Sequence, residues 1–225
     1  MESQIAAADQ QLIPGLSYSL PSAAEYVVSR RMATFFPEGG NQYSPTGVRV
    51  IRFTLADSSV WLDPSTVQLS MTMTNNSTTT GLTFKSPSPL TVFSRCRILV
   101  GGTLVEDWQY YCRTVDMLSQ LNEKFFRLAT EVRSGFGTAA DQNPDAESSA
   151  IAASGLRKVT SGIVAGLFMQ HLYMPLKCAP ITIELEFVPN PTSVVANASS
   201  QQFTLSDVRL LADVVQLDGQ MEDKV

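Results

Sequence analysis

The chain is poor in the residues that most enzymes use for chemistry. Its 225 residues include a single histidine, His171. A metal site needs several converging His, Cys or carboxylate ligands, and a Ser-His-Asp or Cys-His triad would have only His171 as its base. The sequence therefore predicts a protein that is not an enzyme, with no catalytic residues, metal site or cofactor. Because His171 lies in the apolar run FMQHLYMPL, it is expected to be a hydrogen-bonded structural residue.

Cysteine is also scarce. Cys96, Cys112 and Cys178 are odd in number and far apart in the sequence, which excludes a disulfide framework and a zinc knuckle. All three are expected to be small buried hydrophobic residues.

Charge is low throughout the chain. Charged residues make up 16% of the sequence, whereas about 25% is typical of soluble domains. The net charge of −5 and the pI near 4.9 disfavour strong nucleic-acid binding, which requires a basic face. Such a charge-poor surface suits a subunit that packs among copies of itself.

The chain lacks a recognisable targeting or membrane segment. Residues 1–15, MESQIAAADQQLIPG, have neither the basic start nor the apolar centre of a secretory signal. The longest uncharged apolar run, at residues 162–169, is far shorter than the roughly 20 residues that cross a bilayer. We therefore expect a soluble protein made inside the cell, with residues 1–25 forming an N-terminal arm and residues 26–225 forming one all-β domain.

The most ordered pattern in the chain is that of a half-buried β-strand. Between residues 67 and 74, apolar and polar residues alternate, with Val67, Leu69, Met71 and Met73 on one side and Gln68, Ser70, Thr72 and Thr74 on the other. Similar patterns predict about eight strands, at residues 26–36, 48–55, 67–74, 90–100, 156–164, 167–174, 181–188 and 203–217. Gly101 and Gly102 suit a tight hairpin, after which residues 103–105 would pair back briefly.

One segment has a helical period instead. From Asp107 onward, apolar residues recur at steps of three and four, namely Trp108, Tyr111, Cys112, Val115, Leu118 and Leu121. This spacing predicts an amphipathic helix with Asp107 as its N-cap and Glu106 near the positive end of its dipole, continuing through Phe125 and Leu128. Its apolar stripe is expected to pack over the end of the β-structure. The predicted fold is therefore an all-β, eight-stranded jelly-roll barrel or sandwich with one inserted amphipathic helix.

Two further features bear on function. Glu184 and Glu186 share one face of a strand, as a glycosidase pair could, but their alternation with apolar residues favours an outward polar face. Residues 134–155 are small and polar, which predicts a long surface loop, and loops of that length are usually functional. We expect this loop to be exposed or to make contacts.

Five dispersed segments resemble the major capsid proteins of polinton-like viruses and related double-jelly-roll DNA viruses. They are FFPEGGNQYSPTGVRVIRF, WLDPSTVQLSMTMTNN, RILVGGTLVEDWQYYCRTVDML, QHLYMPLKCAPITIELEFVP and FTLSDVRLLADVVQLDGQM, which together cover most of Phe35 to Met221. The resemblance rests on the order, spacing and character of these segments, and none of them is a catalytic signature.

This resemblance implies a structural subunit of an icosahedral virion that assembles with copies of itself, first as a trimer and then as a capsid lattice, together with other capsid proteins. The last segment resembles the end of the first of two jelly rolls, and two would need roughly twice this length. Either the chain is the N-terminal half of a double-barrel protein, or it belongs to a single-barrel relative. A lectin-like carbohydrate-binding jelly roll is the alternative function, and a cupin-type enzyme would need more histidines than the chain has.

Overall fold

A computed structural model of the protein describes residues 27–86, 88–123, 134–135 and 150–217. The expected N-terminal arm at residues 1–25, the helix extension to Phe125 and Leu128, and most of the expected loop at residues 134–155 lie outside the described residues.

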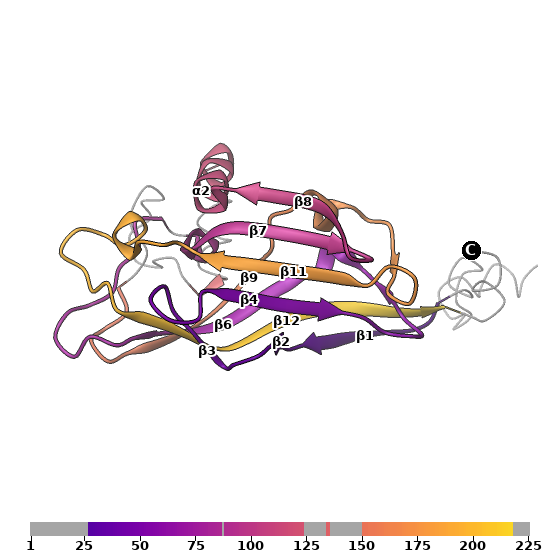
Figure 1. The fold of residues 1–225 in the computed structure, drawn as a ribbon, viewed down its shortest axis with the longest axis horizontal. Helices are drawn as coiled ribbons and strands as arrows, with labels where there is room; N and C mark the ends of the chain where they lie inside the picture. Colours follow the sequence, from indigo (N-terminus) through magenta and orange to yellow (C-terminus); the bar gives the residue numbers. More distant parts are fainter. Residues whose placement is uncertain (1–26, 87, 124–133, 136–149, 218–225) are drawn as a thin grey trace, which may run out of the picture.

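The described chain forms two antiparallel sheets that pack face to face (Figure 1). The five-stranded sheet has the order β2 (Pro37–Glu38), β4 (Val50–Leu55), β11 (Ile181–Phe187), β7 (Phe93–Val100) and β8 (Thr103–Gln109). The seven-stranded sheet has the order β10 (Met174–Pro175), β5 (Trp61–Leu62), β12 (Phe203–Leu217), β6 (Gln68–Asn75) and β9 (Leu156–Gly162), and β12 also pairs with β1 (Val27–Phe35) and β3 (Gln42–Tyr43). This sandwich confirms the predicted all-β jelly-roll class.

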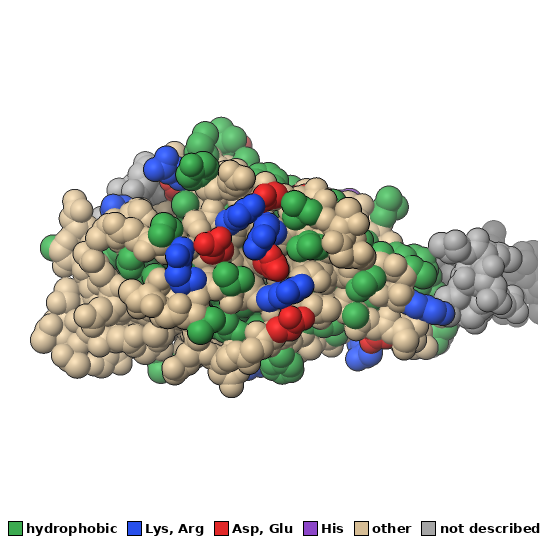
Figure 2. Space-filling view, viewed as in Figure 1, with side chains coloured by type: hydrophobic (Ala, Val, Ile, Leu, Met, Phe, Trp, Pro, Cys, Tyr) green, Lys and Arg blue, Asp and Glu red, His purple; other side chains and the backbone are tan. Residues whose placement is uncertain are grey.

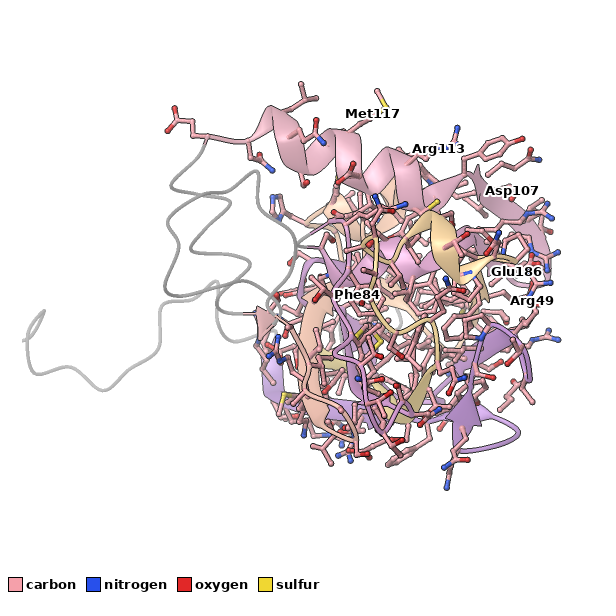
Figure 3. The ribbon with its side chains drawn as sticks, turned by 90° about the vertical axis from the view of Figure 1, so that its left-hand side faces the viewer. Arg49, Phe84, Asp107, Arg113, Met117 and Glu186 are labelled. Carbon is pink, nitrogen blue, oxygen red and sulfur yellow. The ribbon has the colours of Figure 1, made fainter. Side chains whose placement is uncertain are left out.

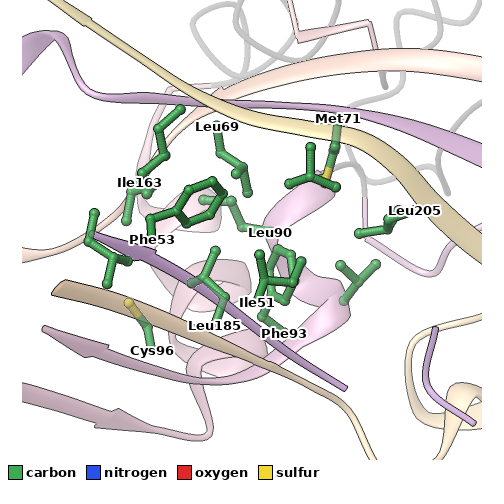
Figure 4. Packing of buried hydrophobic residues seen from close by; sticks show 14 of the residues in the cluster. Ile51, Phe53, Leu69, Met71, Leu90, Phe93, Cys96, Ile163, Leu185 and Leu205 are labelled. Carbon is green, nitrogen blue, oxygen red and sulfur yellow. The ribbon is translucent and has the colours of Figure 1, made fainter. Parts of the chain in front are cut away.

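The core lies between the sheets because alternate residues of each strand point inward. In β4 and β11 every second side chain is buried, including Ile51, Phe53, Ile183 and Leu185. They meet the inward residues of β6, β12 and β7 (Figure 4). Burying each such side chain contributes about 1.5–3 kcal/mol, so the period-two pattern is what holds the two sheets together.

Aromatic rings connect the sheets at one end of the core. Phe187 of β11 lies 5.2 Å from Phe93 of β7 and 6.5 Å from Phe203 of β12, measured between ring centroids. Phe203 in turn meets Phe84 edge to face at 5.3 Å. These separations are those of favourable tilted and T-shaped pairs, so this chain of rings joins the two layers.

Two predicted strands differ from the structure. The strand expected at residues 167–174 is instead the 3-10 helix η5 (Gly166–Met169) followed by the two-residue strand β10. The short return expected at residues 103–105 is the seven-residue strand β8, which pairs with β7 across the Gly101–Gly102 turn. Both glycines have positive φ, as the predicted tight hairpin requires. The other 3-10 helices in the described residues are η3 (Pro64–Thr66), η4 (Pro89–Val92) and η6 (Pro191–Ser193).

The inserted helix, α2 (Tyr111–Leu121), begins later than the sequence pattern predicts. Asp107 and Trp108 belong to β8, so the predicted N-cap is wrong. The N-cap is Tyr110, which has left-handed backbone angles and makes no side-chain cap hydrogen bond. Glu106 caps a different helix: its carboxylate accepts hydrogen bonds from the backbone N–H groups of Gly166 and Leu167 at the start of η5.

Tyr111 and Val115 anchor α2 to the sandwich, as its apolar stripe predicted. The buried Tyr111 hydroxyl accepts a hydrogen bond from the backbone N–H of Val164 at 3.0 Å, and burial raises the pKa of this phenol well above its ordinary value. At the far end of the stripe, the Leu121 side chain is 81% exposed, so the described residues do not cover it.

Candidate contact surfaces

The outer face of the five-stranded sheet carries a row of alternating charges that crosses all five strands. Glu38, Arg52, Glu184, Arg97 and Asp107 stand opposite one another in register on β2, β4, β11, β7 and β8. Ion pairs join Arg52 to Glu38 at 3.5 Å and to Glu184 at 3.7 Å, and Arg97 to Glu184 at 2.8 Å. We call this row the charged rung. Figure 2 shows blue and red side chains alternating over the middle of this face.

Two more ion pairs flank the charged rung. Arg95 donates to both carboxylate oxygens of Asp107, from Nε at 2.7 Å and from Nη2 at 2.6 Å. This hydrogen-bonded guanidinium lowers the pKa of Asp107 below its ordinary value. Arg49 lies 3.4 Å from Glu186, and it also donates to the backbone carbonyl of Phe187 at 3.1 Å.

The charges on this face cancel. The rung and its flanking pairs contain four arginines (Arg49, Arg52, Arg95, Arg97) and four carboxylates (Glu38, Glu184, Glu186, Asp107), which sum to zero. Glu184 and Glu186 do share the outward polar face that the sequence predicted, and each has an arginine partner. Such a face suits contact with another protein. When water is removed from the contact, each charge keeps an oppositely charged neighbour, so few unpaired charges are buried.

Some of the exposed apolar residues lie at the edges of the two sheets. Leu104 and Val105 are exposed on β8, which ends the five-stranded sheet. Val28 and Met32 are exposed on β1, whose only strand pairing within the described chain is with β12. Among the described residues, each of these edges has one side without a strand partner and carries apolar side chains, as expected where one chain meets another.

The polar side of the strand at residues 67–74 is more buried than its alternation predicted. Leu69, Met71 and Met73 are buried as predicted. Ser70, on the polar side, is also buried and accepts a hydrogen bond from the Thr160 hydroxyl of β9 at 3.3 Å. Cross-strand neighbours therefore cover part of the polar side of β6.

The histidine and the three cysteines do not form a common site in the described residues. His171 is exposed rather than packed in an apolar environment, so that expectation is wrong. Only Cys96 is buried, whereas Cys112 is half-buried and Cys178 is exposed, which corrects the expectation that all three would be buried. Within the described ranges no three His, Cys, Asp or Glu residues come together as metal ligands.

The described helices include none that is both long and apolar enough to cross a membrane.

Sequence reasoning did not find the charged rung. The outward charges of single strands were visible, as in Arg95 with Arg97 and Glu184 with Glu186. Their alignment depends on the register between β4, β11 and β7, whose residues are distant in the sequence.

Comparison with known proteins gives a likeness of fold. No family model matches the sequence, and no curated protein matches it. Among solved structures, the chain is similar to PBCV-1 VP54 fitted into a reconstruction of the virophage Sputnik, with a TM-score of 0.58 and 10% identity over 93% of this chain and 47% of that chain. A chain of the PBCV-1 virus capsid model gives a TM-score of 0.57 and 10% identity over the same shares.

The Sputnik virophage structure gives a similar result, with a TM-score of 0.56 and 8% identity over 92% of this chain and 52% of that chain. The chain thus has the jelly-roll fold of viral capsid proteins, as its sequence resemblance predicted. It spans about half the length of the solved capsid chains that it resembles.

Proposed function

We propose that this chain is a structural subunit of an icosahedral viral capsid, located in the virion and made inside the host cell. The observation that carries the proposal is the match of nearly the whole chain to about half of a capsid chain, at a TM-score of 0.58. Because this chain covers only 47% of that capsid chain, the match also supports a parent protein with two jelly rolls, of which residues 26–225 form the first.

The proposed mechanism is geometric. A stiff sandwich presents its edges, β1 on one sheet and β8 on the other, to neighbouring copies. Subunits assemble into trimers and the trimers into a lattice, with other capsid proteins as further partners. Many identical interfaces of modest area stabilise a closed shell through its symmetry.

The lectin-like alternative is less well supported. Tryptophan is a strong stacking partner for a sugar ring, and Trp61 and Trp108 are both half-buried, so the exposed aromatic side chains are Tyr110, Tyr173 and Phe36 among the described residues. The indole N–H of Trp108 also donates to Glu106 at 2.6 Å.

Native mass spectrometry tests the assembly proposal. The 225-residue chain and, where the parent reading frame continues past Val225, the longer protein are each measured over a range of concentrations. We expect the two-barrel protein to form trimers and larger assemblies. A strict monomer at high concentration would contradict the proposal.

Edge variants locate the contact. Met32→Lys on β1 and Leu104→Lys on β8 replace exposed apolar side chains, so they should weaken assembly while leaving the melting temperature unchanged. Gln68→Lys, at an exposed polar position on β6 between β12 and β9, is the matched control and should assemble normally. Equal assembly by all three variants would exclude these edges as the interface.

A further inference from the structure

A groove of about 790 Å³ lies at the end of the sandwich where α2 meets the five-stranded sheet. Its walls come from the start of β7, the residues after β11, η6 and the first turn of α2. Figure 3 shows this end of the molecule, with Arg113 on α2 and with Arg49 and Glu186 below the helix on the same side of the view. The volume lies in the range of pockets that hold small ligands or short peptide segments.

The groove is positively charged although the protein is acidic. Four basic residues (Arg49, Lys85, Arg95, Arg113) and two acidic residues (Asp116, Glu186) line it, and Asp107 pairs with Arg95 just outside the lining, which leaves a balance of +1 in a chain of net charge −5. Apolar residues, among them Val188, Pro189 and Val194, form the remaining walls together with several hydroxyl groups. The local charge is therefore opposite to that of the whole molecule.

Two of these cations have no carboxylate partner among the described residues. Lys85 donates from Nζ to the backbone carbonyl of Thr192 at 2.8 Å, and the guanidinium of Arg113 lies 5.9 Å from the ring centre of Tyr110. In contrast, Arg95 is paired with Asp107, and Asp116 accepts hydrogen bonds from Ser86 at 2.7 Å and Gln120 at 3.2 Å. Lys85 and Arg113 are thus available to an anionic group.

A buried donor in the same groove also lacks a partner. The Nε of Arg49 is shielded from solvent and makes no hydrogen bond to a described residue.

The helix terminus adds to the positive potential. The first turn of α2 contains no acidic residue, and its N-cap Tyr110 provides no side-chain acceptor. No acidic side chain of the first turn therefore compensates the positive end of the helix dipole where Tyr110, Cys112 and Arg113 line the groove. Helix termini of this kind favour carboxylates and other anions.

From these features together, we infer that the groove binds an acidic peptide segment of a partner protein, with carboxylates on Lys85 and Arg113 and an apolar side chain between them against Val188 and Val194. Arginine matches a carboxylate with two parallel N–H donors. The mixed apolar and cationic lining fits a peptide better than a nucleic acid, which needs many phosphate contacts and a basic surface. This site goes beyond assembly of the subunit and does not depend on the proposed capsid role.

Fluorescence anisotropy with two labelled peptides tests the inference. The probe has the sequence Gly-Asp-Leu-Glu-Gly, and the control peptide Gly-Asn-Leu-Gln-Gly keeps the same shape without charge. We expect the acidic peptide to bind at least tenfold more tightly than the amide peptide, because a hydrogen bond between charged groups contributes about 1.5–3 kcal/mol. Equal binding of the two peptides would overturn the inference.

Variants assign the binding to the two cations. Arg113→Gln and Lys85→Gln should each weaken binding of the acidic peptide by about tenfold, whereas Arg31→Gln on β1, outside the groove, should leave it unchanged. Unchanged binding by both groove variants would contradict the assignment. Displacement of the peptide by inorganic phosphate at equal or lower concentration would also contradict it, since the site would then prefer phosphate. Native mass spectra of the same samples report the assembly state separately.

Discussion

Glu184 at the centre of the charged rung offers a direct test of how the five-stranded sheet is held. Its carboxylate lies between the guanidiniums of Arg52, at 3.7 Å, and Arg97, at 2.8 Å, and its side chain is only 15% exposed. The change Glu184→Gln preserves size and removes the charge. It leaves two arginines facing each other across β11 without a shared anion.

The expected loss follows from these contacts. A cross-strand pair of opposite charges contributes about 0.2–1 kcal/mol, so the loss of two pairs lowers the free energy of unfolding by about 0.4–2 kcal/mol. For a domain of this size each kcal/mol shifts the melting temperature by about 2–4 °C. The matched control is Glu38→Gln at the end of the rung, where the carboxylate has a single ion pair at 3.5 Å and is 52% exposed, and it should have almost no effect.

Urea unfolding followed by circular dichroism measures both variants at low salt and at about 1 M NaCl, where the screening length falls to about 3 Å. The difference between wild type and Glu184→Gln should shrink at high salt. Equal stability of the two variants, or a loss that salt does not change, would refute the idea that Glu184 stabilises the sheet through its charge.

Three other predictions follow from burial and pairing. Met71→Asp places an unpaired charge in the core and should abolish soluble folding. The control Gln68→Asp, at an exposed position of β6, should express and melt normally. A soluble Met71→Asp protein with a normal melting curve would disprove the burial of Met71. Burial raises the pKa of the Cys96 thiol to about 12, so iodoacetamide should label Cys178 in the folded protein and Cys96 only after unfolding, as peptide mass spectrometry can check. Because Arg95 lowers the pKa of Asp107, wild type should be more stable than Asp107→Asn above pH 3.8. This difference in the free energy of unfolding should vanish as acid protonates the folded carboxylate. Urea titrations that show an equal difference at pH 7 and pH 2.5 would contradict the pairing.

The strands with strict alternation were predictable because burial of one face imposes a period of two on the sequence. Leu69 and Met71 on β6, and Ile183 and Leu185 on β11, are buried as that period requires. The boundary between β8 and α2 was not predictable in the same way. Trp108 happens to stand three residues before Tyr111, so it matched a helical spacing although it lies in a strand.

The sequence by itself determined the all-β class, the inward residues of the long strands and the hairpin at Gly101 and Gly102, because each follows from local periodicity or local backbone freedom. Tertiary structure alone decided the charged rung and the cationic groove. Glu38, Arg52, Glu184, Arg97 and Asp107 become neighbours only through the register of five strands. Likewise, Lys85 and Arg113 line one groove only because α2 packs over the end of the sheet. Contacts of this kind join residues far apart in the chain, and no local pattern encodes their alignment.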